Sequence, residues 1–545
     1  MDISSRIELK DYIVTDDDDI FVFPASPIQK QIWDLNKLYP DSSVFNKIYG
    51  FRIKGKFNYD AYSWALNKII ERHESLRTCF GYRENSLLQI IKTSMTIDIP
   101  LFNLSDDDRD KKETKIKQII ETELSNPFNL KTGPLIRSVV VKLAEGEFEL
   151  FLSTHSIIAD QTSLIIFNKE LGSYYSRYIA GKYTDVESPR LQYADWVMFN
   201  FTEEQQKSHT GKLEYWKNQL NGFQEVLDLN YDTKKPVRWS LRGDVYNFKI
   251  SKKTSEKIKS IIRKESKIAC PFFLSVLNIL LYKYSGKQEL IVGCPFSNRI
   301  YPGTEDIIGC MANTLPVKTV LKEDDTFNSL LKNVKENVQS AKKNQEVPFE
   351  KIMESLGVDF NPGNSPIYQV NFIYGNSAIV PEFEDLQIES LHLQNLSSQY
   401  DISLHIWESD EVFSGYIEYA TDLFEKATVA RMLGHYVNIL ETGLENPDVK
   451  INNINILTQE ELTLYAHLNE TSVTFPSEKC IHSLFEEQAF RTPDAIALQY
   501  ELQKLTYVQL NEQANCFANF LIKKGVNVGD FVGVNIERCL EIPVV

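Results

Sequence analysis

A histidine and an aspartate five positions apart, His155 and Asp160, are the residues of this chain whose types and spacing best suit chemistry. An imidazole exchanges protons near neutral pH, and a carboxylate can orient a neighbouring group or neutralise a cation. The histidine follows an apolar, β-favouring run at residues 148–154, so it should stand at the end of a strand. Ser156 comes directly after it and brings a hydroxyl, which is a poor base at neutral pH. This step from strand to loop is therefore the first candidate for an active site.

Two elements should position this loop. Residues 135–154 alternate in polarity on both sides of a turn at residues 145–147, which predicts a β-hairpin that ends at His155. Apolar side chains then recur at three- and four-residue steps over residues 161–179, which predicts a helix with one buried stripe. Asp160 stands where that helix begins and can cap its free amides. A capping role and a functional role do not exclude each other.

Length and composition limit the kinds of protein to which this loop can belong. The chain has 545 residues, enough for two large cores and a fragment, and its 43% hydrophobic and 25% charged residues are typical of a globular protein. A net charge of −16 argues against nucleic acid, which selects basic surfaces. The longest apolar run, residues 272–282, is about half of what a membrane span needs. The polar, acidic start of the chain is unlike a secretory signal.

Seven cysteines are scattered along the chain without any CxxC pair. They are Cys79, Cys270, Cys294, Cys310, Cys480, Cys516 and Cys539. Neither a zinc site nor a disulfide framework is suggested by these spacings. We therefore expect a protein of the reducing cytoplasm that has no metal site.

Two helices are predicted in the first part of the chain. Ser26 or Ala25 can cap the first of them, and residues 59–75 carry apolar side chains at helical spacing for the second. His73, near the end of the second helix, is better explained as a packed or surface histidine than as a base. Arg77 follows on the edge of a predicted strand, where a cation needs either solvent or a carboxylate.

The later part of the chain echoes the first in its order of elements. A polar, turn-rich stretch at residues 181–190 predicts a bridge between two lobes. Residues 271–284 are apolar on nearly all sides, which predicts a central buried helix, and residues 290–295 predict a buried strand that leads to Arg299. Helices and strands continue to alternate after it, although the sequence itself does not repeat. The pattern favours an α/β fold.

Six short segments, in order and suitably spaced, resemble motifs of the condensation domains of nonribosomal peptide synthetases. They are residues 26–33 (SPIQKQIW), 72–80 (RHESLRTCF), 193–196 (YADW), 308–314 (IGCMANT), 344–350 (NQEVPFE) and 366–370 (PIYQV). The step from His155 to Asp160 resembles the active-site motif of that family, His-His-X-X-X-Asp, with Ser156 in place of the second histidine. The resemblance covers residues 20–455, and six motifs in order are far more specific than one.

The end of the chain resembles the beginning of an adenylation domain. Residues 481–488 (IHSLFEEQ) and 505–511 (LTYVQLN) carry this resemblance. We expect a linker at residues 456–478 and a truncated adenylation domain at residues 479–545. Because no Gly-rich phosphate loop occurs in the sequence, we expect this fragment not to bind or hydrolyse ATP. No carrier-protein serine motif occurs either. The rest of the adenylation domain is an expected partner.

The resemblance implies two lobes, each like chloramphenicol acetyltransferase, that form a V-shaped pseudo-dimer with a central tunnel. Residues 1–180 would form the N-terminal lobe and residues 181–455 the C-terminal lobe. An upstream donor carrier domain and a downstream acceptor carrier domain would bring thioesters to opposite faces on phosphopantetheine arms, and the chain itself would bind no cofactor. The acceptor's amine would attack the donor's thioester and give an amide and a free thiol.

The resemblance also implies roles for the residues of the loop. His155 corresponds to the first motif histidine, which is usually structural, and Ser156 to the second, which takes a proton or orients the amine. Asp160 corresponds to the aspartate that organises the loop, and its expected partner is Arg299.

Three further positions are implied to lie near the site. Gln161 stands where the family commonly has glycine, and it would either narrow the tunnel or hydrogen-bond a substrate carbonyl. Arg77 and Asn313 correspond to structural or tunnel-lining positions.

Ser156 leaves three interpretations open. The first is an amide-forming condensation domain, natural or engineered, that is weakened by the loss of general acid–base help worth about 10² to 10⁴ in rate. Some activity is expected to remain, because an α-amino group with a pKa near about 7.7 to 8.0 is partly neutral unaided. The second is a degenerate domain that gates, docks a partner or spaces its neighbours. The third is an ester-forming or stand-alone acyltransferase, which the adenylation start disfavours; a heterocyclising domain would have aspartate at His155.

Overall fold

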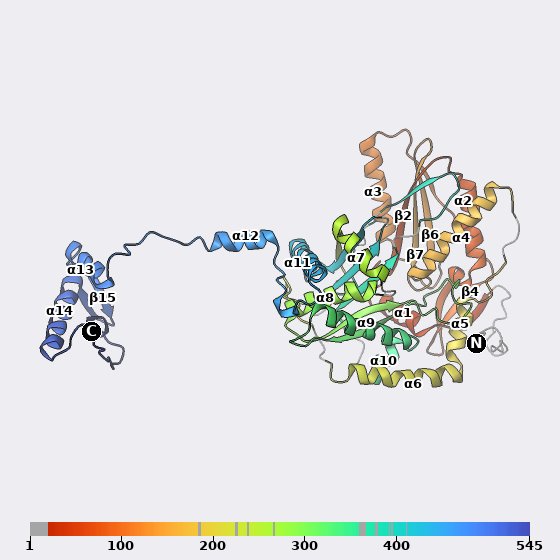
Figure 1. Ribbon diagram of the computed structural model, residues 1–545. Coiled ribbons are helices and arrows are strands. Elements are labelled where there is room, and N and C mark those ends of the chain that lie inside the picture. The colour runs from red at the N-terminus through yellow and green to blue at the C-terminus, as the bar shows by residue number, and fades with distance from the viewer. Residues whose placement is uncertain are drawn as a thin grey trace. The chain divides into compact units, whose positions relative to one another are not determined.

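The computed structural model divides the chain into two compact units, with the division between Thr458 and Gln459 (Figure 1). The structure describes residues 20–183, 187–223, 227–236, 239–264, 268–358, 367–376, 380–391, 393, 396–409 and 411–545. Residues 184–186 of the predicted bridge and Pro366 of the last motif lie outside this part. Each unit is described by itself.

The first unit alternates helices and strands along the chain. Its helices are α1 (Pro27–Leu38), α2 (Tyr59–Arg72), α3 (Arg109–Ser125), α4 (Gln161–Ile179), α5 (Tyr193–Phe201), α6 (Glu203–Leu220), α7 (Lys252–Lys264), α8 (Ala269–Ser285), α9 (Phe327–Lys343), α10 (Phe349–Ser355) and α11 (Lys426–Glu445). Its strands are β1 (Ile20–Pro24), β2 (Asn46–Lys54), β3 (Thr78–Arg83), β4 (Ser86–Lys92), β5 (Leu101–Asn103), β6 (Ile136–Ala144), β7 (Glu147–His155), β8 (Gly243–Lys249), β9 (Glu289–Phe296), β10 (Asn313–Val320), β11 (Val370–Asn376), β12 (Gln387–Leu391), β13 (Ile402–Glu408) and β14 (Phe413–Ala420).

A five-stranded sheet in the order β12-β2-β7-β6-β5 carries the candidate loop. The predicted hairpin is confirmed, since β6 and β7 pair antiparallel and β7 ends at His155. Helices α2 and α4 pack together on one face of this sheet, and α3 packs on the other through Ile116, Ile119 and Ile120 (Figure 1). Both faces are therefore covered, as in other α/β folds. A small sheet, β1-β4-β3, lies beside them.

A second, six-stranded sheet has the order β10-β9-β11-β13-β14-β8 and mixes parallel with antiparallel pairs. Its core face packs on α8, α9 and α11. The predicted buried helix is confirmed as α8, whose residues 271–281 are all buried, and the predicted strand before Arg299 is confirmed as β9. An α/β fold with two sheets follows.

One strand links the two sheets in a way that the sequence did not indicate. Strand β12 comes after β11 in the chain, yet it pairs antiparallel with β2 of the first sheet, Leu391 opposite Gly50. A Cβ on Gly50 would meet the Cβ of Leu391 at 3.0 Å, so the absence of a side chain permits the close approach. The later half of the unit thus completes the sheet that carries the motif.

The second predicted helix is shorter than residues 59–75. It ends at Arg72, because His73 takes an extended backbone conformation, and a 3₁₀ turn at Glu74–Arg77 follows. His73 is buried, and its Nε2 lies 2.8 Å from Oε2 of Glu170 on α4. The expectation of a packed histidine is confirmed.

The second unit, from Gln459 onward, contains helices α12 (Gln459–Leu468), α13 (Ile481–Arg491) and α14 (Tyr507–Lys523) and the hairpin β15 (Ile496–Tyr500) with β16 (Gln503–Thr506). It carries large apolar side chains that are almost fully exposed, among them Phe490 and Phe531. Across the described ranges of both units, no helix is long and apolar enough to cross a membrane.

Candidate active site

Asp160 holds the beginning of α4 and the end of the motif loop together. It is the N-cap of the helix, and its Oδ1 accepts hydrogen bonds from the backbone N–H of Ser163 at 2.8 Å and from the Ser163 hydroxyl at 2.7 Å. The predicted helix at residues 161–179 and its cap are both confirmed. A serine or aspartate cap of this kind supplies acceptors for amides that the first helical turn leaves free.

Asp160 also pairs with Arg299, which comes from the segment after β9. The Arg299 guanidinium donates to both carboxylate oxygens, at 2.8 Å from Nη1 to Oδ2 and at 3.0 Å from Nη2 to Oδ1. Backbone N–H groups of Met311 and Ala312 donate to Oδ2 as well. The side chains of Arg299 and Asp160 are only 4% and 6% exposed. The expected pairing is confirmed, and it joins the loop after β7 to the second sheet.

His155 is buried and packs between the rings of Phe45 and Phe128. Its Nδ1 accepts a hydrogen bond from the backbone N–H of Ile157 at 3.2 Å. Burial, together with the smaller effect of the charge of Lys47, lowers the pKa of His155 to about 3. The ring is therefore neutral at pH 7 and fixes the turn after β7.

Ser156 is half-buried and is bound to the segment before β2. Its backbone N–H and its hydroxyl both donate to the carbonyl oxygen of Phe45, at 2.8 and 2.9 Å. The hydroxyl proton is thus committed to a carbonyl, and the oxygen keeps lone pairs that can accept a hydrogen bond from a substrate. The side chain can orient a donor but cannot remove a proton at neutral pH.

The comparisons with known proteins agree on one family. The family model described as "Condensation domain" matches residues 21–464, which is most of the chain, and the model described as "AMP-binding enzyme" matches residues 485–545. This chain belongs to the condensation domain family. Its C-terminal unit matches the start of an AMP-binding enzyme, as the sequence indicated.

Curated relatives and solved structures are consistent with this assignment. Gramicidin S synthase 2 of Aneurinibacillus migulanus is 32% identical over 526 residues, which are 95% of this chain and 11% of that protein. The X-domain from teicoplanin biosynthesis has a TM-score of 0.72 at 23% identity and covers 82% of this chain and 99% of its own. A four-domain nonribosomal peptide synthetase bound to AMP and glycine has a TM-score of 0.74 at 18% identity, over 93% of this chain and 39% of that one. The chain spans about a tenth of the length of the curated relatives it matches. The predicted α/β fold of the chloramphenicol acetyltransferase type is confirmed.

Tyr193 ties several motifs of the condensation domain together. Its hydroxyl lies 2.9 Å from the Ser26 hydroxyl, the N-cap of α1, and donates to the Cys310 carbonyl oxygen at 2.9 Å. The Ser163 hydroxyl meanwhile hydrogen-bonds the backbone of Gly309. Segments that are far apart in sequence thus converge around the loop of Asp160. The sequence indicated Tyr193 as part of a motif but did not indicate the hydrogen bonds of its hydroxyl group.

Asn313 and Gln161 occupy different surroundings. Asn313 begins β10, and its buried amide donates to the carbonyl oxygens of Gln345 and Val347, which fixes the segment before α10. Gln161 is the first residue of α4 and is exposed.

Arg77, for which we expected solvent or a carboxylate as partner, has backbone carbonyls as its hydrogen-bond acceptors, with the charges of Glu74 and Glu71 nearby. Arg77 is buried, and its guanidinium donates to two backbone carbonyl oxygens, those of Ile70 and Lys92. Carbonyl oxygens at the end of α2 and on β4 replace the expected acceptors, and burial lowers the pKa of Arg77. These contacts hold α2 against the small sheet.

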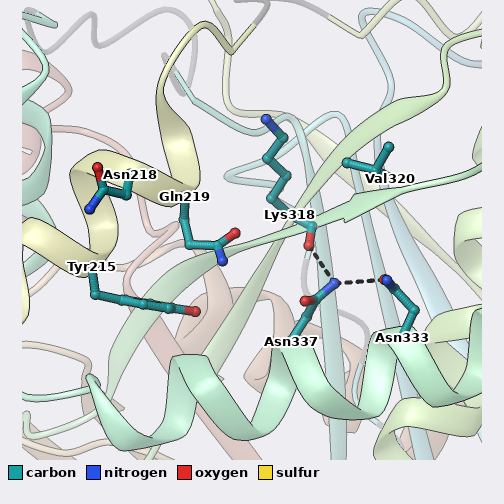
Figure 2. Close-up of a pocket in the computed structure, with 7 residues that line it drawn as sticks. All are labelled: Tyr215, Asn218, Gln219, Lys318, Val320, Asn333 and Asn337. Atoms are coloured by element: carbon teal, nitrogen blue, oxygen red, sulfur yellow. Dashed lines mark hydrogen bonds between the residues drawn. The ribbon is translucent and has the colours of Figure 1, made fainter.

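A polar pocket of about 380 Å³ lies apart from the motif residues, in the part of the domain that contains the second sheet. Figure 2 shows the residues that line it: Tyr215, Asn218, Gln219, Lys318, Val320, Asn333 and Asn337. The Asn337 amide donates to the Lys318 carbonyl and to Asn333 Oδ1, each at 2.9 Å, so the wall is braced by its own side chains (Figure 2). No residue of the motif loop belongs to this wall.

Proposed function

We propose that this chain joins an acyl or peptidyl thioester, held by a donor carrier domain, to the amine of an aminoacyl group held by an acceptor carrier domain. The new bond is an amide, the acceptor nitrogen loses a proton, and the donor's sulfur leaves as a thiol. The observation that carries the proposal is the retained Asp160–Arg299 pair within the order of condensation motifs. The pair holds the motif loop onto the segment after β9, so the loop keeps the arrangement that the reaction needs.

Holding both reactants on tethers supplies much of the catalysis in this proposal. Oriented reactants gain about 7 to 11 kcal/mol over the same reaction between free molecules. The loop residues add a smaller share: His155 fixes the turn, Asp160 anchors it, and the Ser156 oxygen accepts a hydrogen bond from the attacking amine. Because Ser156 cannot act as a base, the amine must lose its proton to water or to another side chain, and the rate is reduced.

We also propose bounds for the domains of the chain. Residues 1–180 and 181–455 are the two lobes, residues 456–478 the linker, and residues 479–545 the start of an adenylation domain whose remainder covers the exposed apolar side chains of this unit. Carrier domains deliver both substrates on phosphopantetheine arms through a tunnel between the lobes, and the chain binds no cofactor itself. Seven free thiols suit a reducing cytoplasm.

A second function has one observation in its favour. The Ser156 hydroxyl is already bonded to the Phe45 carbonyl, so the position serves the structure of the loop even without a substrate. This contact would suit a domain that makes no bonds and instead gates, docks a partner or spaces its neighbours.

Product formation separates the two functions. Donor and acceptor carrier domains are loaded with acyl and aminoacyl groups, mixed with the chain, and the products are followed by mass spectrometry. An amide on the acceptor carrier, absent without the chain, supports the condensation function. No amide from either the chain or its Ser156→His variant would favour the non-catalytic role.

A further inference from the structure

Polar side chains line one face of the six-stranded sheet, the face opposite to its core face. On β14 the residues Ile417 and Tyr419 belong to the core, so by strand alternation Tyr416 and Glu418 point the other way. Glu418 lies opposite Ser403 on β13, and Tyr416 lies opposite His405. These two rings stack with centroids 4.2 Å apart.

Lys47 on β2 connects this face of the six-stranded sheet with the motif loop. Lys47 pairs with Thr154 across β2 and β7, one residue before His155. Its charge lowers the pKa of His155 in the first lobe and also acts on His405 and Glu418 in the second. One ammonium group therefore acts both on the motif loop and on this face of the six-stranded sheet.

The carboxylate of Glu418 is connected to Ser156 by a short series of contacts. Ser398 and the backbone N–H of Gln399 lie beside Glu418 and lower its pKa, while the Ser398 hydroxyl donates to the Tyr400 carbonyl oxygen at 2.8 Å. The Gln399 side-chain amide donates to the Val44 carbonyl oxygen at 3.5 Å, and the next carbonyl, that of Phe45, accepts both hydrogen bonds of Ser156. The segment beside Glu418 is thus joined to the segment that binds Ser156.

Neither charge of this interior is neutralised by direct contact. Among the residues that the structure describes, neither Lys47 nor Glu418 forms an ion pair, and the hydrogen-bonding groups that lower the pKa of Glu418 are Ser398 and the backbone of Gln399. Burial raises the pKa of Glu418, although the charge of Lys47 and those hydrogen bonds oppose the shift. A half-buried carboxylate without a bound cation is a site that a ligand's ammonium group would complement.

We propose that Glu418 receives the α-amine of the acceptor aminoacyl group and presents it to the donor thioester beside Ser156. The inference rests on the proposed condensation function and names a residue for it outside the motif loop. The amine arrives as an ammonium ion and is held by the Glu418 carboxylate, which also accepts its proton. The neutral amine then attacks the thioester carbonyl, a C–N bond forms, the C–S bond breaks, and the thiolate takes up the second proton lost by nitrogen.

Binding of stable acceptor mimics tests this inference without any turnover. The probes are the L-alanyl and L-phenylalanyl amides of aminopantetheine, each with a free amine and as its N-acetyl derivative, and calorimetry or ligand-observed NMR measures their affinities. We expect the chain to prefer the free amines, and Glu418→Gln to weaken them by about 10-fold or more while leaving the N-acetyl forms unchanged. Glu411→Gln, at an exposed carboxylate paired with Lys252, is the matched control and should change neither.

The pH dependence gives a second readout that a structural role would not produce. Affinity for the amine should fall as the pH drops through the pKa of Glu418, because the carboxylate becomes neutral. The groups around Glu418 are Lys47 from β2, Tyr400, and Tyr416 on its own strand. Lys47→Met removes the cation that lowers this pKa, so the loss of affinity should begin at a higher pH than in the parent.

The outcomes separate the inference from the proposed function. Equal affinity for amine and N-acetyl probes, no binding of either, or an unchanged amine affinity in a folded Glu418→Gln would overturn the role of Glu418. Amide formation by the parent would still support condensation in each of these cases. A missing amide together with amine binding that depends on Glu418 would count against condensation and keep the amine site.

Discussion

Asp160 and Arg299, which lie 139 residues apart in the chain, form a two-point ion pair that closes the motif loop onto the segment after β9. Neither side chain has much contact with water, and the guanidinium also donates to the carbonyl of Ile307 and the hydroxyl of Ser163. The geometry of the candidate site therefore depends on a contact between the loop after β7 and the segment after β9.

Removal of one partner of this pair should destabilise the first unit. Arg299→Ala leaves the Asp160 carboxylate buried without its cation, which typically costs about 3 to 5 kcal/mol. Urea unfolding measures the loss. Arg242→Ala is the matched control, since Arg242 is 76% exposed in its pair with Asp422. Its loss should lower the free energy of unfolding by less than about 1 kcal/mol. An Arg299→Ala protein that unfolds like the control would contradict the account of this pair.

Gly309 should not tolerate a side chain. A Cβ at this position would overlap the ring of Tyr193, and Tyr193 cannot move without losing its bonds to Ser26 and Cys310. We expect Gly309→Ala to lower the free energy of unfolding by about 1 to 3 kcal/mol or more. Gly211→Ala, on α6 with nothing near its Cβ, should instead raise it by about 0.5 to 1 kcal/mol. Similar melting temperatures for the two variants would argue against the crowding at Tyr193.

The buried His155 should make stability depend on pH. Its pKa is about 3 in the folded chain and near about 6.5 when unfolded, so between these values the unfolded state binds the extra proton and stability falls as the pH falls. One such group changes the free energy of unfolding by about 1.4 kcal/mol per pH unit in this range. His155→Phe keeps a ring between Phe45 and Phe128 and should remove that share of the slope.

Denaturant titrations at several pH values between about 4 and 7 test this expectation, within the range that the two pKa values define. The exposed His467 offers a control, because its replacement by Phe should leave the slope unchanged. A slope in His155→Phe as steep as that of the parent would mean that the ring is not held neutral in the fold.

Local sequence patterns predicted the hairpin, the helix and the helix cap that position the site. Alternating polarity placed the hairpin before His155, helical spacing placed α4, and the position of Asp160 indicated its cap. These features depend on neighbours in sequence, which is where such patterns carry information. The partnership of Asp160 with Arg299 came from the family resemblance and not from spacing.

Contacts between distant segments could not be predicted in this way. Strand β12 joins the first sheet through partners more than 300 residues away, and nothing in residues 387–391 specifies β2 over another edge. The carbonyl partners of Arg77 and the contact of Gln399 with Val44 were missed for the same reason. Tertiary packing, which brings these segments together, decided all three.

The most direct measurement compares the chain with Ser156→His in single-turnover amide formation between loaded carrier domains. We predict a slow but measurable rate for the parent and a rate about 10² to 10⁴ times higher for the variant, because the imidazole restores general acid–base help. Equal rates in parent and variant would contradict the assignment of position 156 as the proton-handling position of this condensation domain.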